Sequence, residues 1–200
     1  AAEKCKDKIG DKWGPFANFW RTTQLEYTWL RSLMGRHKDF WQITEDSLNK
    51  SMKAFNIDSS MKNELLNLYK ILSPYKEVPE TLKALKEKKF KLAILSNGTP
   101  SLLNELVKSN NLENLFDDIF SIEEVGVYKP NSKVYDIPVK KYKIEKNEVA
   151  FLSANTWDVS GGGNYGYQSI WVNRNNNIFD NLDFKANIEI KDLSGLLNKF

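Results

Sequence analysis

Three short segments of this sequence place polar side chains of the kinds that enzymes use directly after predicted strands. Ser96 and Asn97 follow the aliphatic run KLAIL, Lys129 and Tyr135 follow a second strand, and the segment SANTWD at 153–158 follows the run VAFL. Hydroxyl, amide, ammonium and carboxylate groups can together bind an anionic substrate and orient a water molecule. We therefore treat the three segments as parts of one candidate site.

Each segment alone also has a purely structural explanation. Ser-Asn-Gly is common in turns, Lys-Pro commonly starts a helix, and a tryptophan near a helix N-terminus usually belongs to the core. Their succession on three consecutive strand ends is harder to explain in this way, because ligands of parallel α/β sheets bind at the carboxyl ends of the strands.

The sequence from residue 79 onward alternates between helix and strand patterns. Strands that alternate with helices through short links form a parallel sheet covered on both faces. The predicted fold class is therefore α/β. The predicted helices are 79–88, 100–109, 131–142 and 156–164, and the predicted strands are 90–95, 118–121, 148–152 and 168–172.

The first part of the chain is predicted to be helical and is rich in aromatic residues. A short charged helix is predicted at 2–10, and apolar residues at helical spacing predict a long amphipathic helix at 16–34. Thr44, with two acidic residues after it, predicts the N-cap of the next helix. A leucine stripe predicts one more helix at 59–72, which a Ser-Pro dipeptide ends.

Composition and charge argue against several classes of protein. The chain has 200 residues, 41% of them hydrophobic, which is enough for one α/β domain with an insertion or for two small domains. The net charge is +3, and the lysines of 83–91 are interrupted by apolar residues, as on a solvated helix face rather than a nucleic-acid patch. No apolar run approaches the roughly 20 residues that span a membrane.

The single cysteine and the single histidine limit the chemistry further. Cys5 has no second cysteine with which to form a disulfide or a cysteine metal cluster. His37 lies in the basic stretch GRHKD, and the chain has no serine nucleophile elbow. These facts argue against a hydrolase with a Ser-His-Asp triad.

The polar segments resemble the motifs of the haloacid dehalogenase superfamily, and specifically of its (S)-2-haloacid dehalogenases. LSNG resembles the second motif, VYKP with Tyr135 resembles the third, and FLSANTWD resembles the dehalogenase form of the fourth, with Ala154 where serine is usual. The helical stretch WRTTQLEYTWLRSLM resembles the cap of these dehalogenases. The resemblance covers almost the whole chain. It implies a Rossmann-like α/β core of residues 1–13 and 74–200, and a helical cap domain of residues 14–73.

The fourth motif argues against a phosphatase of the same superfamily. Such phosphatases hold Mg²⁺ with the carboxylates of a Gly-Asp-x-x-x-Asp motif, because the phosphoryl charge must be neutralised. In this chain the first acidic position falls on Ala154, and only Asp158 is acidic. We therefore expect no metal and no cofactor, and a substrate with one carboxylate and a halide leaving group.

The resemblance implies a reaction in two steps. An aspartate carboxylate attacks C2 of a short (S)-2-haloalkanoic acid, the halide leaves, and an ester forms on the enzyme. Water then hydrolyses the ester and releases an (R)-2-hydroxy acid. No segment of this chain matches the first motif, which carries the nucleophile on a central strand. We expect that strand and the nucleophile to precede Ala1, a stable fold to contain the strand, and this chain alone to be inactive.

The resemblance also implies a role for each matching residue. Arg21 and Asn97 hold the departing halide, although a lone arginine on a helix is more often a surface ion-pair partner. Ser96 binds the substrate carboxylate, and Lys129 keeps the nucleophilic carboxylate ionised. The residues that order this pair and the hydrolytic water are Tyr135, Ser153, Asn155 and Asp158. The apolar residues that line the pocket and exclude water are Leu25, Phe40 and Trp157.

Two alternatives stay open at the level of the sequence: a phosphatase acting on a small phosphate ester, and a non-catalytic binding protein with the same fold. Ala154, and Asn131 where aspartate is common after Lys-Pro, depart from the motifs of the family, and we expect them to change catalytic efficiency at most.

The expected partners are the short 2-haloacid and halide, a second copy of the chain in a homodimer, and a cleaved N-terminal segment of the protein itself. We expect a cytoplasmic enzyme without a nucleic-acid or membrane partner.

Overall fold

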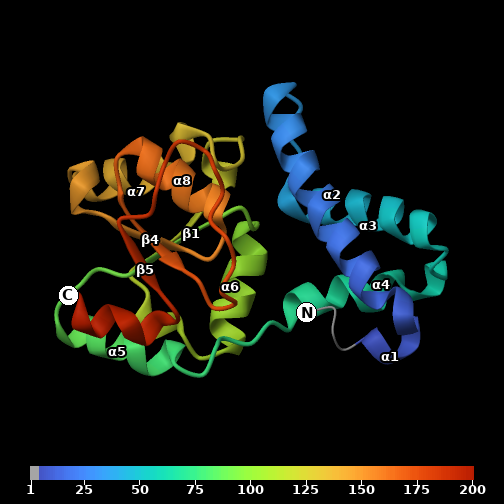
Figure 1. Cartoon of the computed structure of the whole chain (residues 1–200), viewed down its shortest axis with the longest axis horizontal. Coiled ribbons are helices and arrows are strands. Elements are labelled where there is room, and N and C mark those ends of the chain that lie inside the picture. The colour runs from blue at the N-terminus through green and yellow to red at the C-terminus, as the bar shows by residue number, and fades with distance from the viewer. Residues whose placement is uncertain (1–4) are drawn as a thin grey trace. The chain divides into compact units, whose positions relative to one another are not determined.

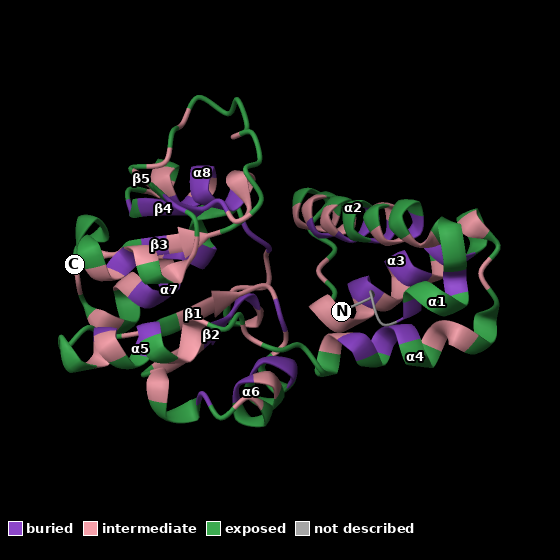
Figure 2. Cartoon of the chain, turned by 60° about the horizontal axis from the view of Figure 1, so that its bottom comes forward, coloured by how far each residue is buried: buried purple, intermediate pink, exposed green. Residues whose placement is uncertain are grey.

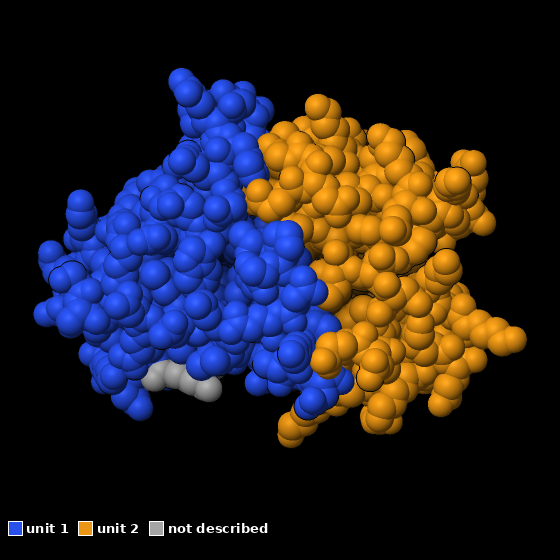
Figure 3. Space-filling model, turned by 180° about the vertical axis from the view of Figure 1, so that it is seen from behind, with its two compact units in different colours: residues 1–73, 97–111 blue, residues 74–96, 112–200 orange. Residues whose placement is uncertain are grey.

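Within residues 5–200, helices come first along the chain and parallel strands begin at Ala93 (Figure 1). The computed structural model describes residues 5–200. They form two compact units, one running up to Ser73 and including Asn97–Asn111, the other made of Pro74–Ser96 and Leu112–Phe200 (Figure 3). We refer to them as the helical unit and the sheet unit.

The helical unit is built around one apolar cluster between its helices. Its helices are α1 (Lys6–Ile9), α2 (Trp13–Leu33), α3 (Phe40–Phe55), α4 (Lys62–Asn67) and α6 (Pro100–Ser109). Buried residues gather on the facing sides of α2, α3 and α4 (Figure 2), and they include Phe16, Trp20, Leu48 and Leu65. The predicted amphipathic helix at 16–34 is confirmed by α2.

The prediction that Thr44 caps a helix is wrong. Helix α3 begins one turn earlier, where the Asp39 side chain accepts a hydrogen bond from the backbone N–H of Gln42 at 2.8 Å. Thr44 lies inside the helix and is fully buried. Its hydroxyl accepts a bond from Gln24 Nε2 at 2.6 Å and donates to the carbonyl of Phe40 at 2.7 Å. Thr44 therefore joins α3 to α2 instead of starting α3.

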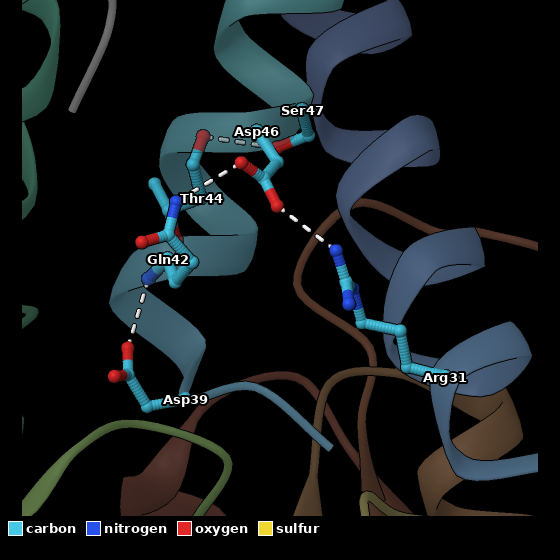
Figure 4. Close-up of polar contacts among 6 residues, drawn as sticks. All are labelled: Arg31, Asp39, Gln42, Thr44, Asp46 and Ser47. Carbon is cyan, nitrogen blue, oxygen red and sulfur yellow. Dashed lines mark hydrogen bonds and ion pairs between the residues drawn. The ribbon is translucent and has the colours of Figure 1, made fainter. Parts of the chain in front are cut away.

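A second polar contact joins the same two helices nearer to the end of α2. Arg31 Nη2 lies 3.0 Å from Asp46 Oδ2, and Gln42 Nε2 donates to the other oxygen of Asp46 at 3.0 Å (Figure 4). The Arg31 and Asp46 side chains are 25% and 32% exposed. Their charges are therefore partly desolvated, and both oxygens of Asp46 have donors.

The predicted helix at 59–72 is broken into three short pieces. The α-helical part is only Lys62–Asn67, with 3-10 turns at Ser59–Met61 before it and Leu68–Lys70 after it. Three leucines of the stripe, Leu65, Leu66 and Leu68, lie in the core, whereas Leu72 is exposed. For the predicted helix at 2–10, the structure gives α1 over Lys6–Ile9, and residues 2–4 lie outside the described residues.

The sheet unit contains only parallel strand pairs. Strand β1 (Ala93–Ser96) pairs with β2 (Asp118–Ser121), while β3 (Ala150–Ser153) pairs with β4 (Gln168–Val172), which pairs with β5 (Ile188–Ile190). The predicted α/β class with parallel pairing is thereby confirmed. The pairs form two sheets where one was predicted, because no ladder among the described residues joins β1 to β3.

Three helices accompany these strands at nearly the predicted positions. They are α5 (Val78–Glu87), α7 (Ser132–Tyr142) and α8 (Thr156–Tyr165). Helix α5 packs against the C-terminal 3-10 helix η8 (Leu193–Asn198) over a cluster of aliphatic side chains. Strand β5 and η8 were not predicted. Both are short, and the apolar pattern of β5 consists of only two isoleucines, one on each side of Glu189, which is too little to predict a strand.

Candidate active site

A buried lysine, aspartate and tyrosine form the centre of the candidate site in the sheet unit. Lys129 Nζ lies 3.1 Å from Asp158 Oδ2, and the Tyr135 hydroxyl donates to Asp158 Oδ1 at 2.8 Å. The three residues are only 6%, 5% and 0% exposed in the order Lys129, Asp158 and Tyr135. An ion pair buried to this degree needs close geometry and further hydrogen bonds to offset the desolvation of both charges.

The hydrogen-bonding direction of Tyr135 follows from its surroundings. Burial first, and the negative charge of Asp158 second, raise the pKa of Tyr135 far above its ordinary value of 10.0. The phenol therefore stays protonated and donates to the carboxylate. Both carboxylate oxygens of Asp158 consequently have a donor, one cationic and one neutral.

Local folding signals explain how these three side chains come together. Asn131 caps α7, because its side chain accepts the backbone N–H of Lys133 at 3.0 Å, and this cap sets Tyr135 in the first turns of the helix. Asp158 lies in the first turn of α8. Helices α7 and α8 pack against each other (Figure 1), so residues 23 positions apart in the sequence meet.

Phe151 of β3 is a part of the site that the sequence analysis missed. Lys129 Nζ lies 4.9 Å from the centre of the Phe151 ring, within the range of a cation–π contact. The same ring meets Tyr135 edge-on at 5.5 Å. Its position in the sequence could have indicated this, because Phe151 lies two residues before Ser153 and alternate residues of a strand point to the same face.

Tyr165 and Tyr167 complete an aromatic support around Tyr135. Their ring centres lie 6.0 Å and 6.1 Å from that of Tyr135. The Tyr167 hydroxyl donates to the backbone carbonyl of Tyr135, and the Tyr165 hydroxyl donates to Asp136. The tyrosine that contacts Asp158 is thus held on several sides, which limits the positions that its hydroxyl can take.

Other predicted residues of the sheet unit stand at the carboxyl ends of their strands. Ser96 is the last residue of β1 and lies opposite Ser121 of β2. Ser153 is the last residue of β3, and its hydroxyl accepts the backbone N–H of Asn155 at 3.2 Å. Trp157 is half-buried in the first turn of α8. The predicted placement of these residues at strand ends is confirmed, whereas their roles stay predictions.

The remaining predicted residues belong to the helical unit. Arg21 is exposed and Leu25 is half-buried one turn further along α2, while Phe40 is the half-buried first residue of α3. Asn97 is half-buried directly after β1. Two residues later Thr99 caps α6 by accepting the backbone N–H of Leu102 at 3.4 Å. Among the predicted residues, hydrogen bonds and an ion pair join Lys129 and Tyr135 to Asp158, and a hydrogen bond joins Asn155 to Ser153.

Within residues 5–200 no three or more His, Cys, Asp or Glu side chains are grouped so that they could hold a metal ion. The helices in the same range are all too short or too polar to cross a membrane.

The sequence and structure are similar to those of known dehalogenases. Residues 18–172 match the family model described as haloacid dehalogenase-like hydrolase. The chain is 34% identical over 199 residues to an (S)-2-haloacid dehalogenase of Pseudomonas sp. strain YL, covering 98% of this chain and 86% of the relative. It is 38% identical over 178 residues to (S)-2-haloacid dehalogenase 1 of Pseudomonas sp. strain CBS-3, covering 88% of this chain and 78% of the relative.

The structure is also similar to a solved dehalogenase structure that contains a covalently bound haloacid. The L-2-haloacid dehalogenase of Xanthobacter autotrophicus with chloropropionic acid covalently bound superimposes with a TM-score of 0.90. It is 27% identical, and the match covers 98% of this chain and 90% of that one.

Proposed function

This chain belongs to the haloacid dehalogenase-like hydrolases, and we propose that it hydrolyses the carbon–halogen bond of short (S)-2-haloalkanoic acids to give (R)-2-hydroxy acids. The observation that carries the proposal is the buried Lys129–Asp158–Tyr135 cluster of the sheet unit. It offers a fixed cation where a carboxylate nucleophile and an anionic substrate must be held together, and its one carboxylate is already occupied by two donors.

The first step is a displacement at C2 of the substrate. An enzyme carboxylate oxygen forms a bond to C2 while the carbon–halogen bond breaks, and the halide leaves with the bonding electron pair. In the dehalogenases that this chain resembles, this carboxylate belongs to the first motif. No segment of residues 1–200 matches that motif. The covalently bound chloropropionic acid in the Xanthobacter enzyme supports an ester intermediate of this kind.

Lys129 is proposed to keep the attacking carboxylate ionised. Asp158 and Tyr135 hold Lys129 on one side and the Phe151 ring lies against it on another, so the ammonium is fixed before substrate arrives. Asp158 itself is a poor candidate for the nucleophile, since both of its oxygens accept hydrogen bonds from buried donors. Asp158 is therefore assigned the role of orienting Lys129.

The resemblance alone assigns the residues that are proposed to bind the substrate and the halide. Arg21 and Asn97 would stabilise the departing halide, because guanidinium and amide N–H groups are suitable anion donors. Ser96 would donate to the substrate carboxylate. The proposed cap is the helical segment 14–73, and its apolar residues Leu25 and Phe40, together with Trp157, would exclude water from the nucleophile.

The second step is hydrolysis of the ester. Water attacks the acyl carbon of the enzyme ester, and the bond between that carbon and the oxygen attached to C2 breaks. The water oxygen stays in the regenerated carboxylate, one of its protons leaves with the hydroxy acid, and the other passes to solvent. Ser153 and Asn155, which are joined by a 3.2 Å hydrogen bond, are proposed to orient this water. Since the bond to C2 is made only in the first step, the product has the inverted configuration.

Chloride release from the two enantiomers of 2-chloropropionate tests the proposal. The full-length protein is expected to release chloride from the (S) enantiomer alone and to form (R)-lactate. Hydrolysis of p-nitrophenyl phosphate that requires Mg²⁺, with no chloride release, would show a phosphatase instead. Binding of either compound without turnover of any would favour the non-catalytic alternative.

A homodimer is proposed as the assembled form. Leu30, Leu33 and Met34 on α2 are 50%, 84% and 63% exposed, which is unusual for large apolar side chains close together on one helix. Light scattering on the purified protein would give twice the mass of the chain. Replacing Leu33 by Lys should then shift the protein toward the monomer.

A further inference from the structure

Helix α8 contains three consecutive glycines, Gly161–Gly163, in its interior. Glycine is a poor residue inside a helix, because it loses more backbone freedom on folding than any other residue and contributes no side-chain packing. A run of three therefore needs a reason. The structure supplies one in the space that surrounds each glycine.

A methyl group at any of the three positions would meet a different neighbour. At Gly161 it would stand 2.5 Å from the Tyr135 hydroxyl oxygen and 2.7 Å from Pro130 Cβ. At Gly162 it would stand 2.5 Å from the Phe151 ring. At Gly163 it would overlap the ring of Phe184. All these contacts are closer than real Cβ atoms show, so the neighbour has to move in each case.

The neighbours differ in their freedom to move. Phe184 is a half-buried side chain in an irregular segment after β4, so its ring can turn away. Tyr135 is fully buried and held by three aromatic rings and by its bond to Asp158. Pro130 cannot rotate its ring away, and it follows Lys129 directly in the chain.

Gly161 thus faces one donor of Asp158 directly and the chain neighbour of the other donor. Its nearest contacts are the hydroxyl that donates to Asp158 and the residue next to the lysine that pairs with Asp158. Asp158 lies three positions earlier on the same helix, so any outward shift of α8 moves the carboxylate away from both partners together.

We infer that Gly161 is a positioning residue of the dehalogenation: the lack of a side chain there lets α8 approach the segment 129–135 closely enough for Lys129 and Tyr135 both to reach Asp158. Gly161 touches no substrate atom in this account and acts only through those three side chains. The inference rests on the proposed function for its kinetic consequence, but the geometric part stands on the contacts alone.

Gly161→Ala tests the inference, with Gly163→Ala as the matched control in the same helix. Alanine should improve the intrinsic helix preference equally in both variants. For the full-length protein we expect Gly161→Ala to lower kcat for (S)-2-chloropropionate about 10- to 100-fold with KM changed less than about threefold, because small misplacements of catalytic groups are costly. Gly163→Ala should keep kcat within about twofold.

The double variant Gly161→Ala with Tyr135→Phe separates positioning from a general loss of stability. Removing the hydroxyl removes the nearer of the two clashes, so the double variant should lose less kcat than the product of the two single losses. A crystal structure of Gly161→Ala should also show Tyr135 Oη or Lys129 Nζ further from Asp158 than the present 2.8 Å and 3.1 Å.

Three results would overturn the inference. They are an equal effect of alanine at 161 and 163, strict additivity with Tyr135→Phe, and unchanged distances in the variant structure. A wild-type protein without dehalogenase activity would instead refute the proposed function, and the distances in the Gly161→Ala structure would still decide the geometric claim. If Gly161→Ala alone does not fold, the Tyr135→Phe background relieves the closest contact, and the distance from Lys129 Nζ to Asp158 can then be compared with and without the alanine.

Discussion

At the scale of single residues, the proposed chemistry depends on a carboxylate that cannot move. Asp158 receives a charged donor on one oxygen and a neutral donor on the other. The charged donor alone would allow the carboxylate to rotate about its own bond. The second donor, Tyr135, removes that freedom and therefore fixes the direction from which the carboxylate holds Lys129.

Replacing Tyr135 by Phe is predicted to lower kcat about 10- to 100-fold, which corresponds to the roughly 1.5–3 kcal/mol typical of a hydrogen bond to a charged group. The aromatic packing of the ring against Phe151 is kept in this variant. Initial rates of chloride release at saturating (S)-2-chloropropionate would measure the effect.

Tyr165→Phe is the control for that prediction. Its hydroxyl donates to Asp136 and not to Asp158, although its ring packs beside Tyr135. We expect its kcat to match the wild-type value. A similar loss in both variants would mean that removing either hydroxyl lowers kcat, and the specific role assigned to the Tyr135 hydroxyl would be wrong.

At the scale of elements, α3 shows how a buried polar residue can be mistaken for a helix cap. Asp39 and Thr44 are both residue types that cap helices, and acidic residues follow Thr44. What distinguishes them is tertiary structure: the hydroxyl of Thr44 is fully buried against Gln24 of α2, whereas Asp39 is exposed.

Two substitutions are predicted to separate the cap from the buried contact. Asp39→Ala removes the cap on the Gln42 N–H and should lower the free energy of unfolding by about 1 kcal/mol. Thr44→Val should cost about 1–3 kcal/mol, because it leaves the buried Gln24 amide without its acceptor. Urea denaturation followed by circular dichroism would measure both. An equal and small effect would contradict the structural assignment of Thr44.

Elements with strong local signals were predictable from the sequence, and elements defined by distant contacts were not. Helix α6 was predicted with its observed bounds because Thr99-Pro100 marks its start, and β4 because Ile170, Trp171 and Val172 form an apolar run. Strand β5 has three residues and exists only through pairing with β4.

For the site, the resemblance assigned Lys129, Tyr135 and Asp158 from the sequence. The Phe151 ring beneath Lys129 and the close approach at Gly161 depend on how separate elements pack.

At the scale of the whole molecule, several carboxylates make the fold sensitive to acid. The hydrogen bond from Lys86, followed by that from the backbone N–H of Leu92, holds the pKa of Asp117 below its ordinary value of 3.8. The hydrogen bond from Lys140, followed by that from Tyr165, likewise lowers the pKa of Asp136. Carboxylates with a depressed pKa stabilise the folded state above the unfolded pKa, and this contribution is lost as the pH falls through the folded pKa.

Acid unfolding is therefore predicted to begin below about pH 4, where these carboxylates take up protons. Asp117 ties α5 to the start of β1 by accepting Lys86 Nζ and the N–H of Leu92, each at 2.7 Å. Lys86→Met should shift the midpoint of acid unfolding to higher pH, since it raises the pKa of Asp117 in the folded state. Lys83→Met on the same helix should leave the midpoint unchanged, because Lys83 pairs only with the exposed Glu80. Equal shifts in both variants would show that net charge, and not Asp117, controls acid stability.

The last prediction concerns the need for a metal ion in the complete enzyme. A phosphoryl group carries charge that requires a divalent cation, whereas a haloacid presents one carboxylate and a halide that arginine, amide and hydroxyl donors can hold. In this chain Asp158 pairs with Lys129, and Ala154 occupies the position where the phosphatase motif has its first aspartate. We therefore expect chloride release to be unchanged after dialysis against EDTA and unaffected by added Mg²⁺. Activity that is lost on chelation and restored by Mg²⁺ would show that a cation enters a site in which Lys129 now provides the positive charge, and the role assigned to Lys129 would have to be abandoned.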